Sequence, residues 1–309
     1  MCFCFSSCNN AIGGTERSYT GSSGNFVILS CVFSRYFVFS IPGSVIYLTG
    51  TANLAVNDTT FVSCMSTGMS GAIHFEASQS ILFRVCGRSC YGYRGHLARI
   101  QCNNAKNNFA DSVSLTNCSY TFNGNDPIVF LNGYQRIMNL NTSYNYAHHG
   151  SGFYSFNPNT LQCKYCSIIH NIAYGSICIH INSGSSTRSL EYSNIIENEC
   201  PIAYGVVYIY SAIVTILRCH MADNFGLLLC SNSSTINIQS SVISHLSSPI
   251  TYGSVIQFSV MYTTSIPTFI THYNTFYCPT FVIQTLHQKE LPYFHNILHM
   301  TSILVQLFF

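Results

Sequence analysis

The sequence predicts an all-β chain folded as a right-handed parallel β-helix, a solenoid of about ten coils. Three observations support this expectation. A glycine marker recurs roughly every 26 residues, within the range of solenoid repeats. Short segments of alternating apolar and polar residues precede a second, shorter marker, and helical periodicity is nearly absent.

The composition favours a large buried core and a nearly uncharged surface. Of the 309 residues, 48% are hydrophobic and 7% are charged, and the formal net charge is +2. Typical soluble domains have about 25% charged residues, so uncharged polar side chains must cover this surface. The chain has too much apolar sequence to be disordered. The small charge, with no basic cluster, indicates no nucleic-acid partner.

The glycine marker consists of a small or aromatic residue, then Gly, then a short apolar run. We expect each copy to begin the same strand of a coil, because solenoid repeats stack equivalent strands on one another. Pro127 and Thr280 replace the glycine in two further copies. The glycine copies are Pro42-Gly43, Ser70-Gly71, Arg94-Gly95, Ser151-Gly152, Tyr174-Gly175, Tyr204-Gly205, Phe225-Gly226 and Tyr252-Gly253.

The second marker is a six-residue template with Cys first and Asn last. Residues 166–171 and 219–224 match it fully, 193–198 has Ser for Cys, and 240–245 keeps only the frame. We expect the Asn side chains to form a hydrogen-bonded ladder, with Cys or Ser filling a tight interior corner. Further cysteines are expected to extend the Cys column upstream: Cys31, Cys64, Cys86 and Cys118.

Alternating strands precede these markers at residues 112–116, 188–192 and 235–239. A single coil cannot close its own core, so it stacks on the next coil at about 4.8 Å. The alternative folds are a β-sandwich and a propeller. Propeller repeats are about 40 residues long, and a sandwich does not need registered copies.

The predicted organisation is a loose N-terminal lead-in at 1–24, the β-helix at 25–290, and a C-terminal cap or truncated apolar tail at 291–309. No signal peptide is visible, since no Lys or Arg precedes Arg17 and the first apolar run is short. No apolar segment has the character of a membrane span, which needs about 20 residues. We therefore expect a leaderless product or a partial chain.

No motif indicates a metal or another cofactor. The chain has 16 cysteines, but its C-x-x-C at residues 163–166 lacks a second pair at zinc-site spacing. The segment His148-His149-Gly150 is interpreted as a polar loop tip. The remaining cysteines are read as small buried hydrophobic residues.

One group of side chains suggests catalysis. The fifth template position holds His170, Glu197 and Asp223 in successive coils. If the register is right, they stack one rung apart, and neighbouring carboxylates raise one of their pKa values. An acid beside a base is the minimum for glycoside hydrolysis. The alternative is that they are solvated turn residues beside the Asn ladder.

Two further sets of surface residues are candidates for binding or modification. Tyrosines before the repeat glycine would form an aromatic column for sugar rings or protein partners, or else pack in the core at a corner. These tyrosines are Tyr174, Tyr204 and Tyr252. Four sequons are N-glycan acceptors if the chain is secreted: Asn57, Asn117, Asn141 and Asn232.

Two short motifs resemble the polymorphic outer membrane protein repeats of intracellular bacteria. Residues 70–73, Ser-Gly-Ala-Ile, resemble the G-G-A-[ILV] motif, and residues 122–125, Phe-Asn-Gly-Asn, match F-x-x-N. Cysteine-rich right-handed β-helix surface proteins of protozoan parasites are similar in composition. The resemblance implies a cell-surface or extracellular β-helix used in adhesion. Its partners would be host or self surface proteins or carbohydrate.

We therefore expect a non-enzymatic surface or secreted interaction module. The alternative is a carbohydrate-active β-helix enzyme, a polysaccharide hydrolase or lyase, that uses the stacked turn carboxylates. The sequence signatures of known β-helix pectinases, such as an Asp-Asp pair, are absent. A third hypothesis is a fragment or decayed copy without an independent role.

Overall fold

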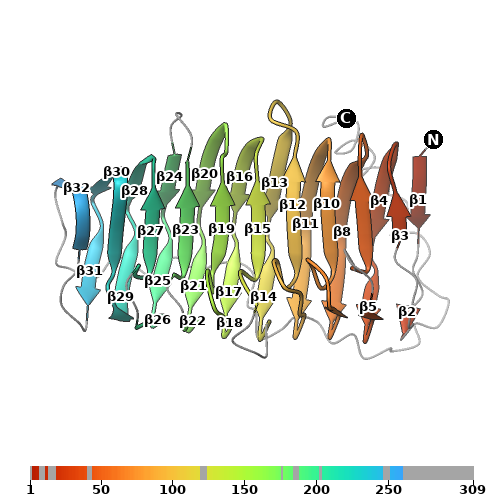
Figure 1. The fold of residues 1–309 in the computed structure, drawn as a ribbon, viewed down its shortest axis with the longest axis horizontal. Helices are drawn as coiled ribbons and strands as arrows, with labels where there is room; N and C mark the ends of the chain where they lie inside the picture. Colours follow the sequence, from red (N-terminus) through yellow and green to blue (C-terminus); the bar gives the residue numbers. More distant parts are fainter. Residues whose placement is uncertain are drawn as a thin grey trace, which may run out of the picture. The chain divides into compact units, whose positions relative to one another are not determined.

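The computed structural model describes residues 2–6, 11–12, 19–39, 44–118, 124–174, 177–183, 188–201, 204–245 and 251–259. It confirms the predicted fold class, because these residues form an all-β parallel solenoid without a helix (Figure 1). There are about eight turns, slightly fewer than the ten predicted. The prediction counted copies as far as Thr280, which lies outside the described residues.

Every full turn contributes one strand to each of three parallel ladders, called here the first, second and third faces. The first face contains β4 (Asn25–Leu29), the starts of β8 (Asn53–Val62) and β11 (Gln79–Arg88), β13 (Asn107–Asp111), β16 (Tyr134–Met138), β20 (Thr160–Lys164), β24 (Arg188–Glu191), β28 (Ile213–Leu217) and the end of β30 (Leu229–Gln239).

The second face follows the first around a sharp corner. It contains β5 (Val32–Ser34), the ends of β8 and β11, β14 (Ser114–Thr116), β17 (Asn141–Ser143), β21 (Ser167–Ile169), β25 (Asn194–Ile196), the start of β29 (His220–Gly226) and β31 (Val242–His245). Short strands continue beyond it: β6 (Phe37–Val38), β9 (Met65–Ser66), β18 (Tyr146–Ala147), β22 (Ile172–Ala173) and β26 (Glu199–Cys200).

The third face completes the turn and begins near each glycine marker. It contains β7 (Ile46–Thr49), β10 (Ile73–Ala77), β12 (Ala98–Cys102), β15 (Ile128–Leu131), β19 (Phe153–Phe156), β23 (Ile179–Asn182), β27 (Val207–Tyr210), the start of β30 and the start of β32 (Thr251–Ser259). The front row of arrows in Figure 1, from β12 to β27, belongs to this face.

Successive turns are stacked in register. Asn53 lies opposite Asn25, 28 residues earlier, whereas Ser234 contacts Ala212 of the preceding turn, 22 residues earlier. These separations of 28 and 22 residues lie on either side of the predicted period of roughly 26 residues. Loops of different length therefore absorb the variation while the strands keep a constant frame.

Strands also occur in the segment predicted as a loose lead-in. β1 (Cys2–Ser6), β2 (Ala11–Ile12) and β3 (Tyr19–Gly21) pair in parallel with β4, β5 and β7. By contact density the chain divides into two compact units, Met1–Cys278 and Pro279–Phe309. All described residues belong to the first unit, and the predicted cap at 291–309 lies outside them.

The core is continuous from turn to turn. Alternate side chains on each strand point inward, as in β10, where Ile73 and Phe75 are fully buried. Equivalent residues stack along the axis, and the Phe33 ring lies 5.0 Å from the Phe61 ring of the next turn. Burying such a side chain contributes about 1.5–3 kcal/mol. The helix is thus held together by burial between turns.

The predicted Asn ladder is present at the corner after the second face. Asn145, Asn171, Asn198 and Asn224 are buried in successive turns. The side-chain amides of the first three each donate to the carbonyl oxygen of the next Asn at 3.0–3.1 Å. Each also donates to a backbone carbonyl of the preceding turn, for example Asn198 Nδ2 to Ile168 O at 2.8 Å.

The upstream cysteines do not form the single column that the sequence analysis predicted. Cys64 and Cys118, with Cys90 between them, continue the Asn ladder: the Cys118 N–H donates to the Asn145 side chain at 2.9 Å. Cys31 lies at the other corner, between the first and second faces, as Cys166 and Cys219 do. Cys86 lies on a strand, opposite Thr60. Both corners favour small buried groups, so a cysteine alone does not specify its corner.

No stretch of the described chain forms an apolar helix long enough to cross a membrane.

Candidate ligand-binding cleft

One line of outward-pointing side chains runs along the third face. Their strand neighbours point into the core, because side chains alternate along a strand. Backbone pairing places them opposite one another in successive turns, and we call this line the outer row. Its members are Tyr47, His74, Arg99, Val129, Tyr154, His180, Tyr208, Cys230 and Tyr252.

Rings within the outer row stack on each other. The Tyr154 and His180 rings lie 4.5 Å apart at 25°, and the His180 and Tyr208 rings 5.0 Å apart at 50°. Tyr47 and His74 form a similar pair at 5.1 Å. The row therefore combines aromatic carbon with hydroxyl and ring nitrogen groups over successive turns.

A cavity of about 520 Å³ opens over the middle of the outer row. Its floor is formed by outer-row residues of β12 to β23, including Arg99, Tyr154 and His180, with Phe156 beside them. Its wall is formed by the loops that precede these strands: Arg94, Asn125, Asp126 and His149. Arg94 and His149 are exposed, whereas Asp126 is buried. The cavity therefore has a solvent-facing rim and a desolvated interior.

The wall keeps its shape because its loops also pair across turns. Asn125 forms isolated parallel bridges with Arg94 on one side and His149 on the other. The Asp126 N–H donates to the His149 carbonyl, and the His96 N–H donates to the Asp126 carbonyl, both at 2.9 Å. The Asp126 backbone is thus fixed on both sides, which orients its side chain.

The Asp126 carboxyl group lies against Gly150, which adopts a φ of +64°. A Cβ atom at Gly150 would overlap the Asp126 Oδ1 atom. Only glycine therefore permits this approach. Burial raises the pKa of Asp126 well above its ordinary value, and the nearby Arg94 guanidinium only partly opposes the shift. The carboxyl group is consequently neutral well above the pH at which an exposed Asp ionises, and it can donate a hydrogen bond.

Burial also favours the neutral forms of the two histidines and of Tyr154 in the cavity. Burial lowers the pKa of His180 to about 4 and shifts that of His149 downward. Burial, with Asp126 nearby, raises the pKa of Tyr154 to about 12. The Tyr154 hydroxyl oxygen accepts a hydrogen bond from Asn182 Nδ2 at 3.4 Å, so its proton is free to point elsewhere.

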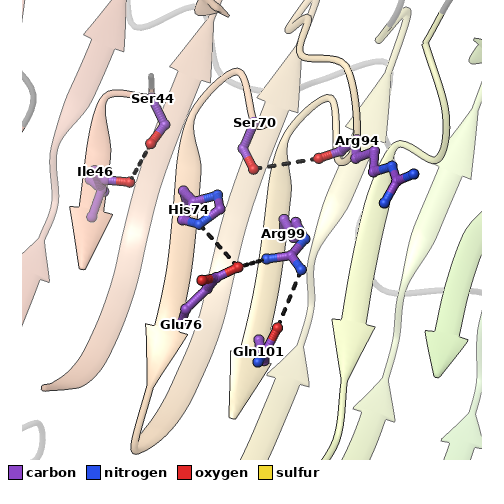
Figure 2. Close-up of polar contacts among 8 residues, drawn as sticks. All are labelled: Ser44, Ile46, Ser70, His74, Glu76, Arg94, Arg99 and Gln101. Carbon is purple, nitrogen blue, oxygen red and sulfur yellow. Dashed lines mark hydrogen bonds and ion pairs between the residues drawn. The ribbon is translucent and has the colours of Figure 1, made fainter. Parts of the chain in front are cut away.

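A charged network lies at one end of the cavity. Figure 2 shows Glu76 between His74 and Arg99, and Arg99 also reaches Gln101. Glu76 Oε1 contacts His74 Nε2 at 3.4 Å and pairs with Arg99 Nη1. Glu76 thus neutralises the charge of Arg99. The Arg94 carbonyl accepts from Ser70, while its side chain extends away from that contact (Figure 2).

The predicted acid–base column lies elsewhere, at the corner after the second face. His170, Glu197 and Asp223 occupy equivalent positions, each with a left-handed φ of 53–55°. His170 Nδ1 lies 2.8 Å from Glu197 Oε2. Their side chains are 37% and 46% exposed, and Asp223 is exposed too. The predicted stacking is present, at solvated corner positions beside the Asn ladder.

The three tyrosines proposed for binding are exposed, but they do not share one column. Tyr252 belongs to the outer row. Tyr204 lies in the turn between β26 and β27, with its ring 5.1 Å from the Tyr208 ring. Tyr174 lies at the start of the equivalent turn between β22 and β23, directly after the short strand. Exposures of 56%, 45% and 68% for Tyr174, Tyr204 and Tyr252 show that none packs in the core.

The sequons differ in accessibility. Asn117 and Asn232 are exposed, and Asn57 is half-buried. Asn141 is only 6% exposed within β17. Asn117 and Asn232 are therefore the acceptors compatible with the folded chain.

The C-x-x-C motif points into the core. Cys163 and Cys166 are buried with their Sγ atoms 3.2 Å apart. The hydrogen bond with Cys166 and burial raise the pKa of Cys163. Within the described residues, no cluster of three or more His, Cys, Asp and Glu side chains has a metal-binding arrangement.

The sequence analysis does not identify the cavity, and it interprets His149 as part of a polar loop tip. One signal is present in the sequence: the outward position of the third-face strands carries His74 and Arg99 and, after Val129, Tyr154 and His180. Alternation within each strand identifies that position. Asp126, however, directly precedes Pro127, which replaces the glycine in this copy of the repeat marker. A search for the glycine marker therefore does not identify Asp126.

Comparisons with protein-family models, with curated proteins and with solved structures found no match to this chain. The likeness to polymorphic outer membrane protein repeats therefore depends on its short motifs alone.

Proposed function

We propose that this protein is a non-enzymatic interaction module that binds carbohydrate along the outer row of its third face. The observation that carries the proposal is the 520 Å³ cavity, where aromatic rings and hydrogen-bonding groups converge on an otherwise regular sheet. Specific ligand sites are typically concave, with apolar surface and a few oriented polar groups.

The chemistry of the cleft suits sugars. A sugar presents hydroxyl groups that both donate and accept, and C–H surfaces that pack on aromatic carbon. Tyr154 and His180 supply polar ring edges, while Phe156, 38% exposed, supplies apolar surface at the cavity. The row continues through Tyr208 with exposed Tyr204 and Tyr210 nearby. A chain of several sugar units would have contacts over successive turns.

A surface or extracellular location completes the proposal. It is supported by the motifs at residues 70–73 and 122–125, which resemble repeats of surface adhesins, and by the exposed sequons at Asn117 and Asn232. A surface poor in charge also suits a module that binds neutral hydroxyl groups.

The test is binding of the purified chain to a panel of soluble polysaccharides, measured by affinity electrophoresis. Phe156→Ala should weaken binding about tenfold, the effect of losing a well-packed aromatic contact. Tyr134→Ala removes an equally exposed ring from the first face and should leave binding unchanged. Absence of binding to the whole panel, or equal loss in both variants, would rule out the third-face site.

The second candidate function is a carbohydrate-active enzyme centred on Glu197 and Asp223. It is favoured by the 2.8 Å contact between His170 and Glu197, which places a base beside a carboxylate one turn before Asp223. Any reducing ends released from the same panel should disappear in a Glu197→Ala, Asp223→Ala double variant. Cleavage that survives the double variant, or no cleavage at all, ends this hypothesis.

A further inference from the structure

We propose that the Asp126 cavity is a subsite for a carboxylate-bearing sugar, a uronic acid unit, within the carbohydrate that the third face binds. This inference rests on the proposed function and adds the charge of the ligand to it. It is argued from the charges that surround the cavity, from the approach of Gly150, and from polar groups with hydrogen-bonding capacity left for a ligand.

The cavity has an excess of one positive charge. Arg99 lines it but is paired with Glu76. No ion pair joins Arg94 to any carboxylate in the described part of the chain. Its backbone N–H donates to the Met69 carbonyl, and its carbonyl accepts from Ser70. Burial favours the neutral forms of Asp126 and of both histidines, which leaves the Arg94 guanidinium without a full counter-charge in the cavity. An anionic group would neutralise it.

Asp126 acts here as a donor. It is packed under Gly150 in the desolvated wall, where the neutral carboxylic acid is favoured. A carboxylic acid can donate its proton to a ligand carboxylate, a short and strong type of hydrogen bond. Arg94 and Asp126 both line the same space, so a single carboxylate can meet the guanidinium and the acid together.

Two more polar groups of the cavity have hydrogen-bonding capacity left for a ligand. The Tyr154 hydroxyl accepts from Asn182, which leaves its own proton for a ligand. His180 Nε2 is buried without a hydrogen-bond partner among the described residues. Buried polar atoms are normally satisfied, so an unsatisfied nitrogen at the cavity floor points to a ligand atom. The sugar hydroxyls beside a uronate carboxylate match these positions.

The test compares oligogalacturonate with its methyl ester, which has the same sugar backbone without the charge. Wild-type protein should bind the acid at least tenfold more tightly than the ester by isothermal titration calorimetry at pH 7. A charge-assisted hydrogen bond contributes about 1.5–3 kcal/mol, so Arg94→Gln should weaken binding of the acid about 10- to 100-fold and leave the ester unaffected. Arg88→Gln removes an exposed arginine on β11 and is the matched control.

The Asp126→Asn variant tests whether residue 126 acts by donating a hydrogen bond and not through its charge. Asn keeps a donor at every pH, so this variant should bind the acid near pH 7. Wild-type affinity should fall as the pH rises and Asp126 ionises and repels the ligand, and the variant should not show this fall. Circular dichroism confirms that each variant is folded, and if Asp126→Asn does not fold, the Arg94→Gln result decides alone.

The outcomes distinguish the two proposals. Equal affinity for acid and ester, or no effect of Arg94→Gln, overturns the uronate subsite and leaves carbohydrate binding intact. Tighter binding of a sulfated polymer than of the uronate overturns the carboxylate assignment. Failure to bind acid, ester and every neutral polymer overturns both proposals.

Discussion

The same inner corner is built differently in the two halves of the helix. In the later turns it holds asparagines, Asn145 to Asn224, which we call the amide segment. In the earlier turns it holds Cys64, Cys90 and Cys118, the thiol segment. Each residue in both segments donates to an equivalent backbone carbonyl of the preceding turn. The distances are 2.8 Å from Asn198 to Ile168 and 3.5 Å from Cys90 to Phe61.

The comparison shows what this corner requires: one small group that both donates to and accepts from the neighbouring turn. The Cys64 N–H donates to the Cys90 sulfur, as the Asn171 N–H donates to the Asn198 oxygen at 3.0 Å. A thiol can fill both roles, but sulfur is a weak donor and a weak acceptor. The amide segment should therefore be the more strongly hydrogen-bonded part of the stack.

The largest effect is expected from breaking the amide segment at Asn198. Its side chain makes hydrogen bonds to Ile168, Asn171 and Asn224. Asn198→Ala leaves several buried groups unsatisfied and should reduce the free energy of unfolding by about 4 kcal/mol, measured by urea denaturation. Glu197→Ala, at the neighbouring exposed corner, should change it by less than about 0.5 kcal/mol. A similar loss in both variants would contradict the ladder as the source of stability.

The next-largest effect is a loss of folding stability at low pH, which should be greater in the turns of the thiol segment than in those of the amide segment. Burial lowers the pKa of His74 to about 4, with Glu76 opposing and Arg99 reinforcing the shift, and burial lowers that of His96 to about 3. Both lie in turns that contribute a cysteine to the thiol segment. Each histidine is neutral when folded and binds a proton when unfolded below its ordinary pKa of 6.5, so stability is full above pH 6.5 and is lost as the pH falls. Each contributes about 1.4 kcal/mol per pH unit.

Together the two histidines should weaken the earlier turns by about 2 kcal/mol between pH 6.5 and 5.5, because an unfolded histidine is only half protonated at pH 6.5. In the later turns His180, whose pKa burial also lowers to about 4, should contribute about half as much. Native-state hydrogen exchange, corrected for its intrinsic pH dependence, should show protection falling first around residues 64–118. In a His74→Gln, His96→Gln double variant this selective loss should disappear. Uniform loss along all turns would contradict the assignment.

The smallest effects come from exchanging the two corner residues. Asn198→Cys keeps a weak donor and acceptor and should cost about 2 kcal/mol, less than alanine at the same site. Cys90→Asn should change stability by no more than about 1 kcal/mol, since the volumes are similar and the carbonyl acceptor is already in place. Thermal unfolding curves measure both. If Cys90→Asn costs as much as Asn198→Ala, the two segments are not equivalent corners.

Sequence reasoning succeeded where contacts repeat and failed where they do not. Asn171, Asn198 and Asn224 stood at one template position, so their ladder followed from the period alone. The cavity depends on Arg94, Asp126 and His149, which lie in loops of unequal length, and no single repeat contains its pattern. The cysteines were harder still, because two different corners accept the same residue and only the backbone register separates them.

In-register pairing has a consequence for chain length. Asn53 lies opposite both Asn25 and Gln79, so excising residues 53–78 would place Gln79 directly opposite Asn25. After loss or duplication of one whole turn, the side chains of the core and of the Asn ladder therefore remain stacked in register. This molecule can be shortened or lengthened in units of one turn, in the way that a modular rod is, with each remaining surface row kept in line.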